Sequence, residues 1–273
     1  MVNLFWYELR SRFGVILGWG IGLALFGAMN IGVWPEAGEQ MQPLADIAVL
    51  QAIGLALGSF AGFVASAVIG YFPLILGIYA IIASTGTLAG EEDDGTLELI
   101  VAAPLSRWQV VTVKAIALEI SAFLIIVIGG LGNALTLEAI RGLIEVDVTS
   151  AELFVVTLSA WPITAAFIMM GLFLGAFLPN RRTAALTTSL IFIASYFGLL
   201  LVRIAETLQP FEVLSLFNYF DFTATAFTEG PQAQDVGFLL GVALIFFVLA
   251  LLSFRRRNVT VGAWPWQRAR VIG

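Results

Sequence analysis

The sequence predicts an all-α membrane protein with six transmembrane helices. Of its 273 residues, 60% are hydrophobic and only 12% are charged, and the mean hydropathy is +0.97. Soluble domains have an apolar share of about half. Several apolar runs reach twenty residues or more, as a membrane-crossing helix requires. These runs are apolar on every side rather than alternating with a two-residue period, which disfavours a membrane β-barrel.

Six stretches are long enough to cross a hydrocarbon core of about 30 Å at about 1.5 Å per residue. We expect residues 1–273 to form a single six-span domain. The expected spans are residues 13–33, 65–90, 110–136, 154–178, 183–202 and 236–254.

Residues 47–90 contain no charged side chain, and they are long enough to cross the membrane either once or twice. Lys and Arg concentrate on the cytosolic side of membrane proteins. If residues 47–90 cross once, eleven of the thirteen cations are cytosolic and only Arg141 and Arg203 lie outside. If they cross twice, Arg181, Arg182 and the arginine triplet at 255–257 would be exported. We therefore predict one crossing, with both termini in the cytosol.

Two further segments are predicted to lie along the membrane surface. Phe5, Leu9 and Phe13 share one helical face with arginines between them, which is typical of an N-terminal interfacial helix. Residues 211–227, between spans 5 and 6, are apolar and aromatic but are interrupted by Asn218 and Asp221. They are too polar to span, so we expect short re-entrant or interfacial helices on the outer side.

Small residues recur at every fourth position in span 1 and in the residues that lead into span 2, and span 4 has a single pair with the same spacing. The residues are Gly14, Gly18 and Gly22; Gly54, Gly58, Gly62, Ser66 and Gly70; and the pair Gly171 and Gly175. Such ridges let helix backbones approach closely in lipid. Packing within the chain is the more frequent use of a ridge, and a subunit interface is the alternative. Pro73 and Pro162 lie inside expected spans, where proline kinks a helix.

The composition excludes several kinds of catalytic site. The chain has no cysteine and no histidine, so thiolate nucleophiles, histidine bases and Cys/His metal sites are absent. A phosphate-binding P-loop needs a lysine after a glycine-rich turn, but Lys114 is the single lysine and no such turn precedes it. We expect no catalytic residue, no metal, no bound cofactor and no nucleic-acid partner for this chain.

Glu119 is the one acidic residue well inside an expected span. Intramembrane acids are functional candidates by default. The alternative is a structural glutamate that is hydrogen-bonded to a neighbouring helix or reached by water. Lys114, five residues earlier, lies on a different helix face and is not an obvious partner.

Residues 91–107, EEDDGTLELIVAAPLSR, form a charged island between two apolar runs. Four consecutive acids cannot lie in hydrocarbon, so the island must surface between spans 2 and 3. We expect the acids to lie at the N-terminus of a short helix that ends before Pro104. Leu97, Ile100 and Val101 would share one face of this helix. The alternative is a solvated loop that only carries charges between two spans, and such a loop would need neither the apolar face nor the proline.

This island resembles the E-x-x-x-GTLE-(apolar)-P-[LV]-SR signature of permease subunits in the type-2 family of ABC exporters (ABC-2-type transporter permeases). The matching residues are Glu91, Gly95, Thr96, Leu97, Glu98, Pro104, Ser106, Arg107 and Lys114. The rest of the chain is similar in layout only. The resemblance implies a prokaryotic cytoplasmic-membrane protein that works with a second permease chain, in a homo- or heterodimer, and with separate ABC ATPase subunits that hold ATP and Mg²⁺.

The resemblance also makes the helix from about 95 to 103 the cytosolic coupling helix, with an apolar face in a groove of the ATPase. Ile100 and Val101 belong to that face, and the acids at 91–94 and Arg107 would form its polar rim. Because the spans carry almost no charge, a hydrophobic or amphipathic substrate is favoured. Two alternatives remain: a permease for metal-centre or haem-protein maturation, and a non-transporting protein that relays an ATPase's motion to an extracytoplasmic partner.

Overall fold

The computed structural model describes residues 1–41, 43, 47, 58–94, 105–146 and 148–256, and these residues form helices, turns and short connections without a strand. The helices are α1 (Val2–Ser11), α2 (Phe13–Met41), α4 (Phe60–Ala67), η2 (Ile69–Tyr71), α5 (Phe72–Thr85), η3 (Gly86–Gly90), α6 (Glu91–Asp93), α8 (Arg107–Ile140), η4 (Arg141–Leu143), α9 (Ser150–Leu158), α10 (Ala160–Phe177), α11 (Arg181–Ile204), η5 (Glu206–Leu214), η6 (Leu216–Tyr219), α12 (Thr225–Thr228) and α13 (Ala233–Arg256).

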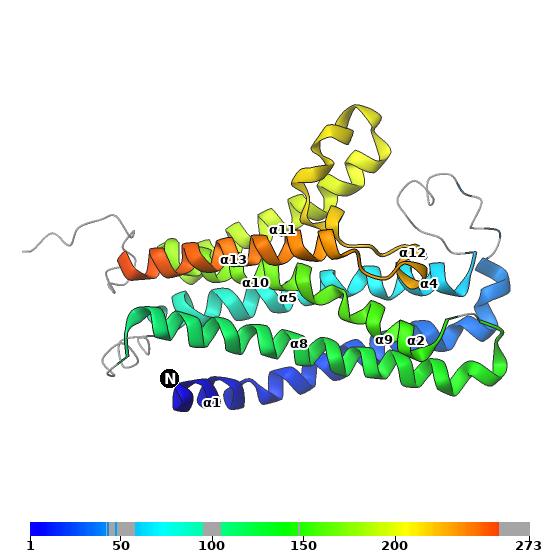
Figure 1. Ribbon diagram of the computed structural model, residues 1–273, viewed down its shortest axis with the longest axis horizontal. Coiled ribbons are helices and arrows are strands. Elements are labelled where there is room, and N and C mark those ends of the chain that lie inside the picture. The colour runs from blue at the N-terminus through cyan, green and yellow to red at the C-terminus, as the bar shows by residue number, and fades with distance from the viewer. Residues whose placement is uncertain (42, 44–46, 48–57, 95–104, 147, 257–273) are drawn as a thin grey trace, which may run out of the picture.

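Six helical stretches in the described residues are long and apolar enough to cross a membrane, which confirms the predicted all-α, six-span fold. They are Phe13–Gly38, Phe60–Asp93, Arg107–Leu143, Ser150–Phe177, Arg181–Ile204 and Ala233–Arg256. The second begins five residues earlier than expected. Ser59 caps its first turn by accepting a hydrogen bond from the Gly62 backbone N–H at 3.1 Å. Residues 58–94 thus form one path from end to end of the bundle (Figure 1).

Pro73 and Pro162, the two prolines inside expected spans, mark breaks, whereas Pro35 lies within the continuous helix α2. Pro73 lies in the first turn of α5, just after η2 separates α4 from α5. Pro162 lies in the first turn of α10, and Ser159 separates that helix from α9. Proline lacks an N–H donor and its φ is fixed near the helical value, so it is tolerated where a helical segment begins. Spans 2 and 4 are therefore each built from successive helical pieces.

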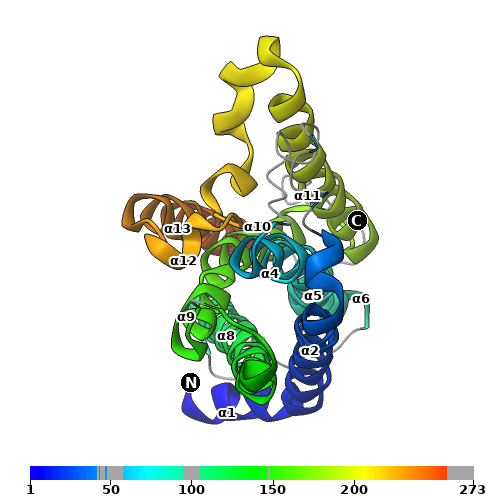
Figure 2. The ribbon, with the colours of Figure 1, turned by 90° about the vertical axis from the view of Figure 1, so that its right-hand side faces the viewer.

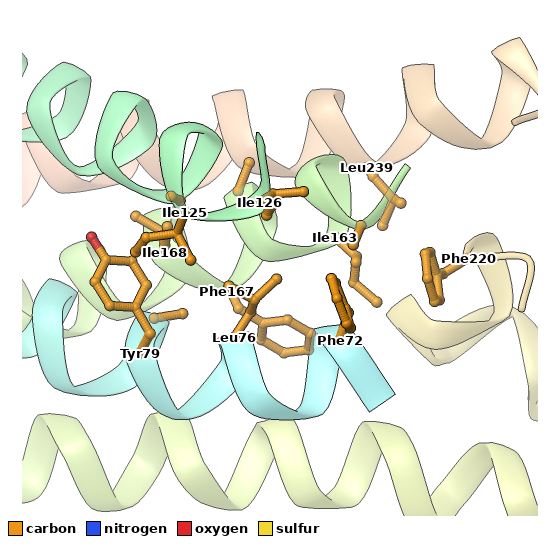
Figure 3. Packing of buried hydrophobic residues seen from close by; sticks show 14 of the residues in the cluster. Phe72, Leu76, Tyr79, Ile125, Ile126, Ile163, Phe167, Ile168, Phe220 and Leu239 are labelled. Carbon is orange, nitrogen blue, oxygen red and sulfur yellow. The ribbon is translucent and has the colours of Figure 1, made fainter. Parts of the chain in front are cut away.

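Helix α10 is the central element of the bundle and packs against α13, α5, α11 and α8 (Figure 2). It has the largest buried share of the six spans. The core side chains from α5, α8 and α10 interdigitate (Figure 3); labelled there are Phe72, Leu76, Tyr79, Ile125, Ile126, Ile163, Phe167 and Ile168. Helix α2 lies along α8 on the other side of the bundle.

The glycines of spans 4 and 1 have different surroundings. At Gly171 an added Cβ would clash with the Ser84 Oγ, and at Gly175 it would contact Thr85, so this pair packs α10 against α5. At Gly14, Gly18 and Gly22 an added Cβ would have no described neighbour within 4 Å outside its own helix turn. Among the described residues the ridge of span 1 is therefore not in close helix contact, and its use as a subunit interface stays a prediction.

The segment between spans 5 and 6 consists of short helices, as predicted. Helix α11 begins against α10 and α5, and its far end and η5 project from the rest of the bundle (Figures 1 and 2). The chain returns through η6, which is fixed to α11 because the Ser215 hydroxyl donates to the Ser195 carbonyl at 2.7 Å. Tyr219 then stacks on Phe238 of α13, with ring centroids 3.9 Å apart. The N-terminal segment is likewise helical, as α1.

Labelling of single cysteines tests the predicted sidedness, and the cysteine-free chain needs no background substitutions. We expect cysteines at Asp94 and Arg182, which lie at the end that holds α1, to be protected from a membrane-impermeant maleimide added to intact cells. Cysteines at Glu145 and Glu229, at the opposite end, should react. Labelling at position 94 from outside would contradict the topology and would place two crossings within residues 47–90.

Candidate functional site

Positive charge gathers at one end of the bundle, the end that holds α1 and the last turn of α13 (left in Figure 1). The described cations there are Arg10, Arg12, Arg107, Lys114, Arg181, Arg182, Arg255 and Arg256. Arg141 and Arg203 lie near the other end. The charged island also begins here, because α6 is the last turn of span 2 and α8 starts after the connection.

Lys114 binds two carboxylates at this end of the bundle. Its side chain is fully buried, although Lys is almost never found so unless paired. The ammonium Nζ donates to Oε1 of Glu8 at 2.5 Å and to Oε1 of Glu91 at 2.6 Å. Glu8 belongs to α1, Glu91 to α6 and Lys114 to α8. One ammonium therefore joins the N-terminal helix, the end of span 2 and the start of span 3.

Arg12 extends this arrangement. Its guanidinium Nη2 lies 3.2 Å from Oε2 of Glu8 and donates to Oγ1 of Thr87 at 3.0 Å. Glu8 thus holds one cation on each carboxylate oxygen. Together Glu8, Arg12, Glu91 and Lys114 form what we call the ionic cluster, with two negative and two positive charges. Buried ions are tolerated when they are paired and hydrogen-bonded in this way.

The local backbone explains how Glu91 reaches Lys114. Helical hydrogen bonding continues past α5 through the π-helical turn η3, and the Asp94 N–H still bonds to the Gly90 carbonyl at 2.9 Å. The Arg181 side chain passes close to Gly90, and a Cβ added there would lie 3.2 Å from its Cδ, so the arginine side chain would have to shift slightly. The π turn lets the helix run on into α6, so Glu91 faces α1 and α8.

This path corrects one sequence expectation. Glu91, Glu92 and Asp93 lie at the C-terminal end of the span 2 helix rather than at the N-terminus of a following helix. The helix dipole does not favour acids there, and the cations of α1 and α8 offset it. Glu92 is buried, whereas Asp93 and Asp94 are exposed. The Asp93 carboxylate accepts a hydrogen bond from the Arg181 backbone N–H at 3.1 Å.

Of the predicted coupling residues, the acids at 91–94 and Arg107 fall in the described part of the chain. Glu91 is in the ionic cluster. Arg107 begins α8, and its Nη1 donates to the Phe254 carbonyl of α13 at 3.4 Å. Just before it, the Ser106 backbone N–H donates to the Gln109 side chain at 2.9 Å. The others lie outside the described residues: Gly95, Thr96, Leu97, Glu98, Ile100, Val101 and Pro104.

Glu119 does not join the ionic cluster. It lies further along α8, between α10 and α13 and beside Trp161. This agrees with the expectation that Lys114 is not its partner.

Three residues of this site were missed by sequence reasoning: Glu8, Arg12 and Thr87. Two signals were available. Glu8 and Arg12 have the i, i+4 spacing of a helical ion pair. Lys114, inside an apolar run, requires a buried acid, because an unpaired cation in a span is costly. The sequence did not indicate that the acid would come from α1.

Comparisons with known proteins give one result. The comparison with curated proteins finds no match. A family model, ABC-2 family transporter protein, matches residues 3–259, nearly the whole chain, which includes all four residues of the ionic cluster. Taken with six helices that can cross a membrane, this match shows a multi-pass membrane protein of a transporter family. The chain belongs to the ABC-2 family of transporter proteins.

Proposed function

We propose that this chain is the permease subunit of an ABC exporter, and that it moves a hydrophobic or amphipathic substrate with energy from ATP hydrolysed by a separate subunit. Family membership makes it a permease of an ABC transporter, which associates with an ABC ATPase subunit. The export direction, the class of substrate and pairing with a second permease chain are the finer parts of the proposal.

The observation that carries the proposal is the ionic cluster at the base of the charged island. The island's connection leaves span 2 at α6 and enters span 3 at α8. Glu91 at its start is bonded to Lys114 on span 3, and Lys114 is bonded to Glu8 on α1. A force applied to residues 95–104 would therefore act on two spans and on the N-terminal helix together, rather than on a loose loop.

ATP-driven closure of the ATPase pair would then move the spans of two permease chains as packed bodies and alternate access to the substrate. ATP and Mg²⁺ would remain on the ATPase. The open Gly14–Gly18–Gly22 face of span 1 supports pairing, since small residues permit close helix contacts in lipid. The spans contain few charges, which supports a hydrophobic or amphipathic cargo in the cytoplasmic membrane.

The outer connection between spans 5 and 6 does not favour a relay function. A relay to an extracytoplasmic partner would call for a folded outer domain, whereas residues 205–232 form only short helices and turns. The relay and the maturation permease are the alternatives to this proposal, and the following experiment distinguishes export of an amphiphile from a relay.

The experiment uses the chain together with the ABC ATPase that co-purifies with it, in inside-out proteoliposomes. We expect ATP-dependent accumulation of an amphiphilic dye inside the vesicles. The chain alone should hydrolyse no ATP, because its single lysine is buried in the ionic cluster and no phosphate-binding loop is available. Coupled ATP hydrolysis without movement of any amphiphile would contradict export and favour a relay. Turnover by the purified chain, free of the ATPase, would contradict the division of labour.

A further inference from the structure

An apolar groove lies between α8, α10 and α13, away from the ionic cluster. Its volume is about 310 Å³, and its walls include Ile116, Ile120, Trp161, Met169, Leu244 and Phe247. Ile116 is 46% exposed and Leu244 is 61% exposed, so the groove opens sideways to the surroundings of the bundle. In a membrane those surroundings are lipid.

Glu119 supplies the one carboxylate in this lining. Both of its oxygens are buried, and neither accepts a hydrogen bond from the described residues. Trp161 interacts with the carboxylate, but its indole N–H does not reach hydrogen-bond geometry and makes no other hydrogen bond in the described part of the chain. An ionised carboxyl group in apolar surroundings is costly unless it gains a partner.

The helices around the groove bring no cation to Glu119. Helix α10 contains no charged residue. On α13 the charged residues of the described segment are Asp235 and the arginines at 255 and 256, at the two ends of the helix. Lys114 precedes Glu119 by five residues, about 140° around α8, and is already bonded to Glu8 and Glu91. No described side chain around the groove therefore offers Glu119 a counter-charge, and a bound cation would supply one.

We propose that this groove binds a lipophilic monocation, such as a quaternary ammonium, protonated amine or phosphonium compound with an apolar body. Glu119 provides the counter-charge, and the Trp161 ring adds a cation–π contact, for which tryptophan is the best of the aromatic side chains. The aliphatic and aromatic walls contact the apolar body. If the proposed exporter function holds, this names the class of its cargo.

The position of the groove suits such a ligand. Glu119 lies about 7.5 Å further along α8 than Lys114, at the usual rise per residue. It is therefore just inside the charged end of the bundle. An amphiphilic cation dissolved in the adjacent leaflet, with its charge near the head groups, would meet the groove from the side without crossing the hydrocarbon core.

Tetraphenylphosphonium and tetraphenylborate form a matched pair of probes, because they have the same shape and opposite charge. Binding is measured on the full chain in nanodiscs, so it does not depend on ATP or on transport. We expect Glu119→Gln to weaken tetraphenylphosphonium binding about tenfold or more, as loss of a desolvated charge pair implies, and to leave tetraphenylborate binding no weaker. Glu138→Gln, an exposed carboxylate on the same helix, is the control and should change neither.

Two further variants keep the test decisive if Glu119→Gln folds poorly. Leu244→Trp, which fills the rim of the groove, should weaken tetraphenylphosphonium binding with Glu119 intact, and Glu119→Asp should retain part of the affinity. Equal affinity in wild type and Glu119→Gln would overturn the proposal, and so would a Leu244→Cys cross-link between two copies that closes the groove. Either result would leave the proposed exporter function intact. Binding of the cation without any transport would contradict the exporter function and leave the cation site intact.

Discussion

Lys114→Met is expected to destabilise the folded permease by about 3–5 kcal/mol, the range for removal of one partner from a buried ion pair. Methionine preserves most of the side-chain volume, so the effect reports charge rather than a cavity. The measurement is thermal unfolding of the purified chain in detergent, followed by tryptophan fluorescence, together with the monodisperse fraction on gel filtration.

The reason is the balance of charge in the ionic cluster. With Lys114 the cluster contains two cations and two carboxylates, and Lys114 is bonded to both carboxylates. Without it, Glu91 loses its bond to the ammonium and Glu8 keeps only Arg12. The cluster then carries one more negative than positive charge. The contacts that join α1, span 2 and span 3 are lost at the same time, so we also expect weaker retention of the ATPase.

A second substitution distinguishes charge balance from packing. Lys114→Met combined with Glu91→Gln leaves Glu8 and Arg12 as a neutral pair, and we expect it to recover much of the lost stability. Arg141→Met, which removes an exposed ion pair with Glu138, is the control and should have a much smaller effect. Equal damage from Lys114→Met and the double variant would show that the cluster does not act through charge.

Ile100→Asp is expected to release the ATPase subunit or to uncouple its hydrolysis from transport, while all six spans remain inserted. Residues 95–104 lie outside the described residues, so this prediction depends on the sequence pattern and on the fixed ends of the connection. Leu97, Ile100 and Val101 fall within about 100° of arc on one helical face and can enter one apolar groove together.

The expected effect is large because each of these side chains contributes about 1.5–3 kcal/mol when fully buried. An aspartate on that face would have to lose its water without gaining a partner. The readouts are a pull-down of the ATPase and the transport assay described above, both at equal amounts of membrane-inserted permease.

Ala102→Asp is the matched control, because residue 102 is about 200° around the helix from residue 100. It introduces the same charge in the same segment, and we expect a much milder effect. If the two variants behave alike in both assays, the segment does not dock through this face and the helical assignment is wrong.

Hydropathy and charge were enough to predict the spans. Six apolar stretches and the breaks at Pro73 and Pro162 follow from local chemistry, since an apolar run of twenty residues has few alternatives in lipid and proline cannot continue a helix ladder. A single crossing in the interval 47–90 was predicted from the distribution of arginines, and the described residues contain one span there, Phe60–Asp93. The structure moved the start of the second span only to Phe60.

The candidate site was predictable only in part. The island at 91–107 is visible because its charges interrupt an apolar sequence, and Glu119 because it is alone in a span. The structural roles of Glu8 and Arg12 are not visible, because α1 reads as an amphipathic surface helix and its contact with α8 brings together residues 106 positions apart. The pairing of Glu91 with Lys114 was also missed, since the π turn at Gly86–Gly90 determines which way Glu91 faces.

The sequence by itself determined the class of the protein, the number of its spans and the segment that separates spans 2 and 3. These are properties of consecutive residues, and the membrane imposes them on any chain of this pattern. The tertiary structure alone decided which acids pair with Lys114, which glycine ridge is open and which helices enclose Glu119. Those outcomes depend on how distant helices pack, because an ion pair or a groove forms only when side chains from different spans meet.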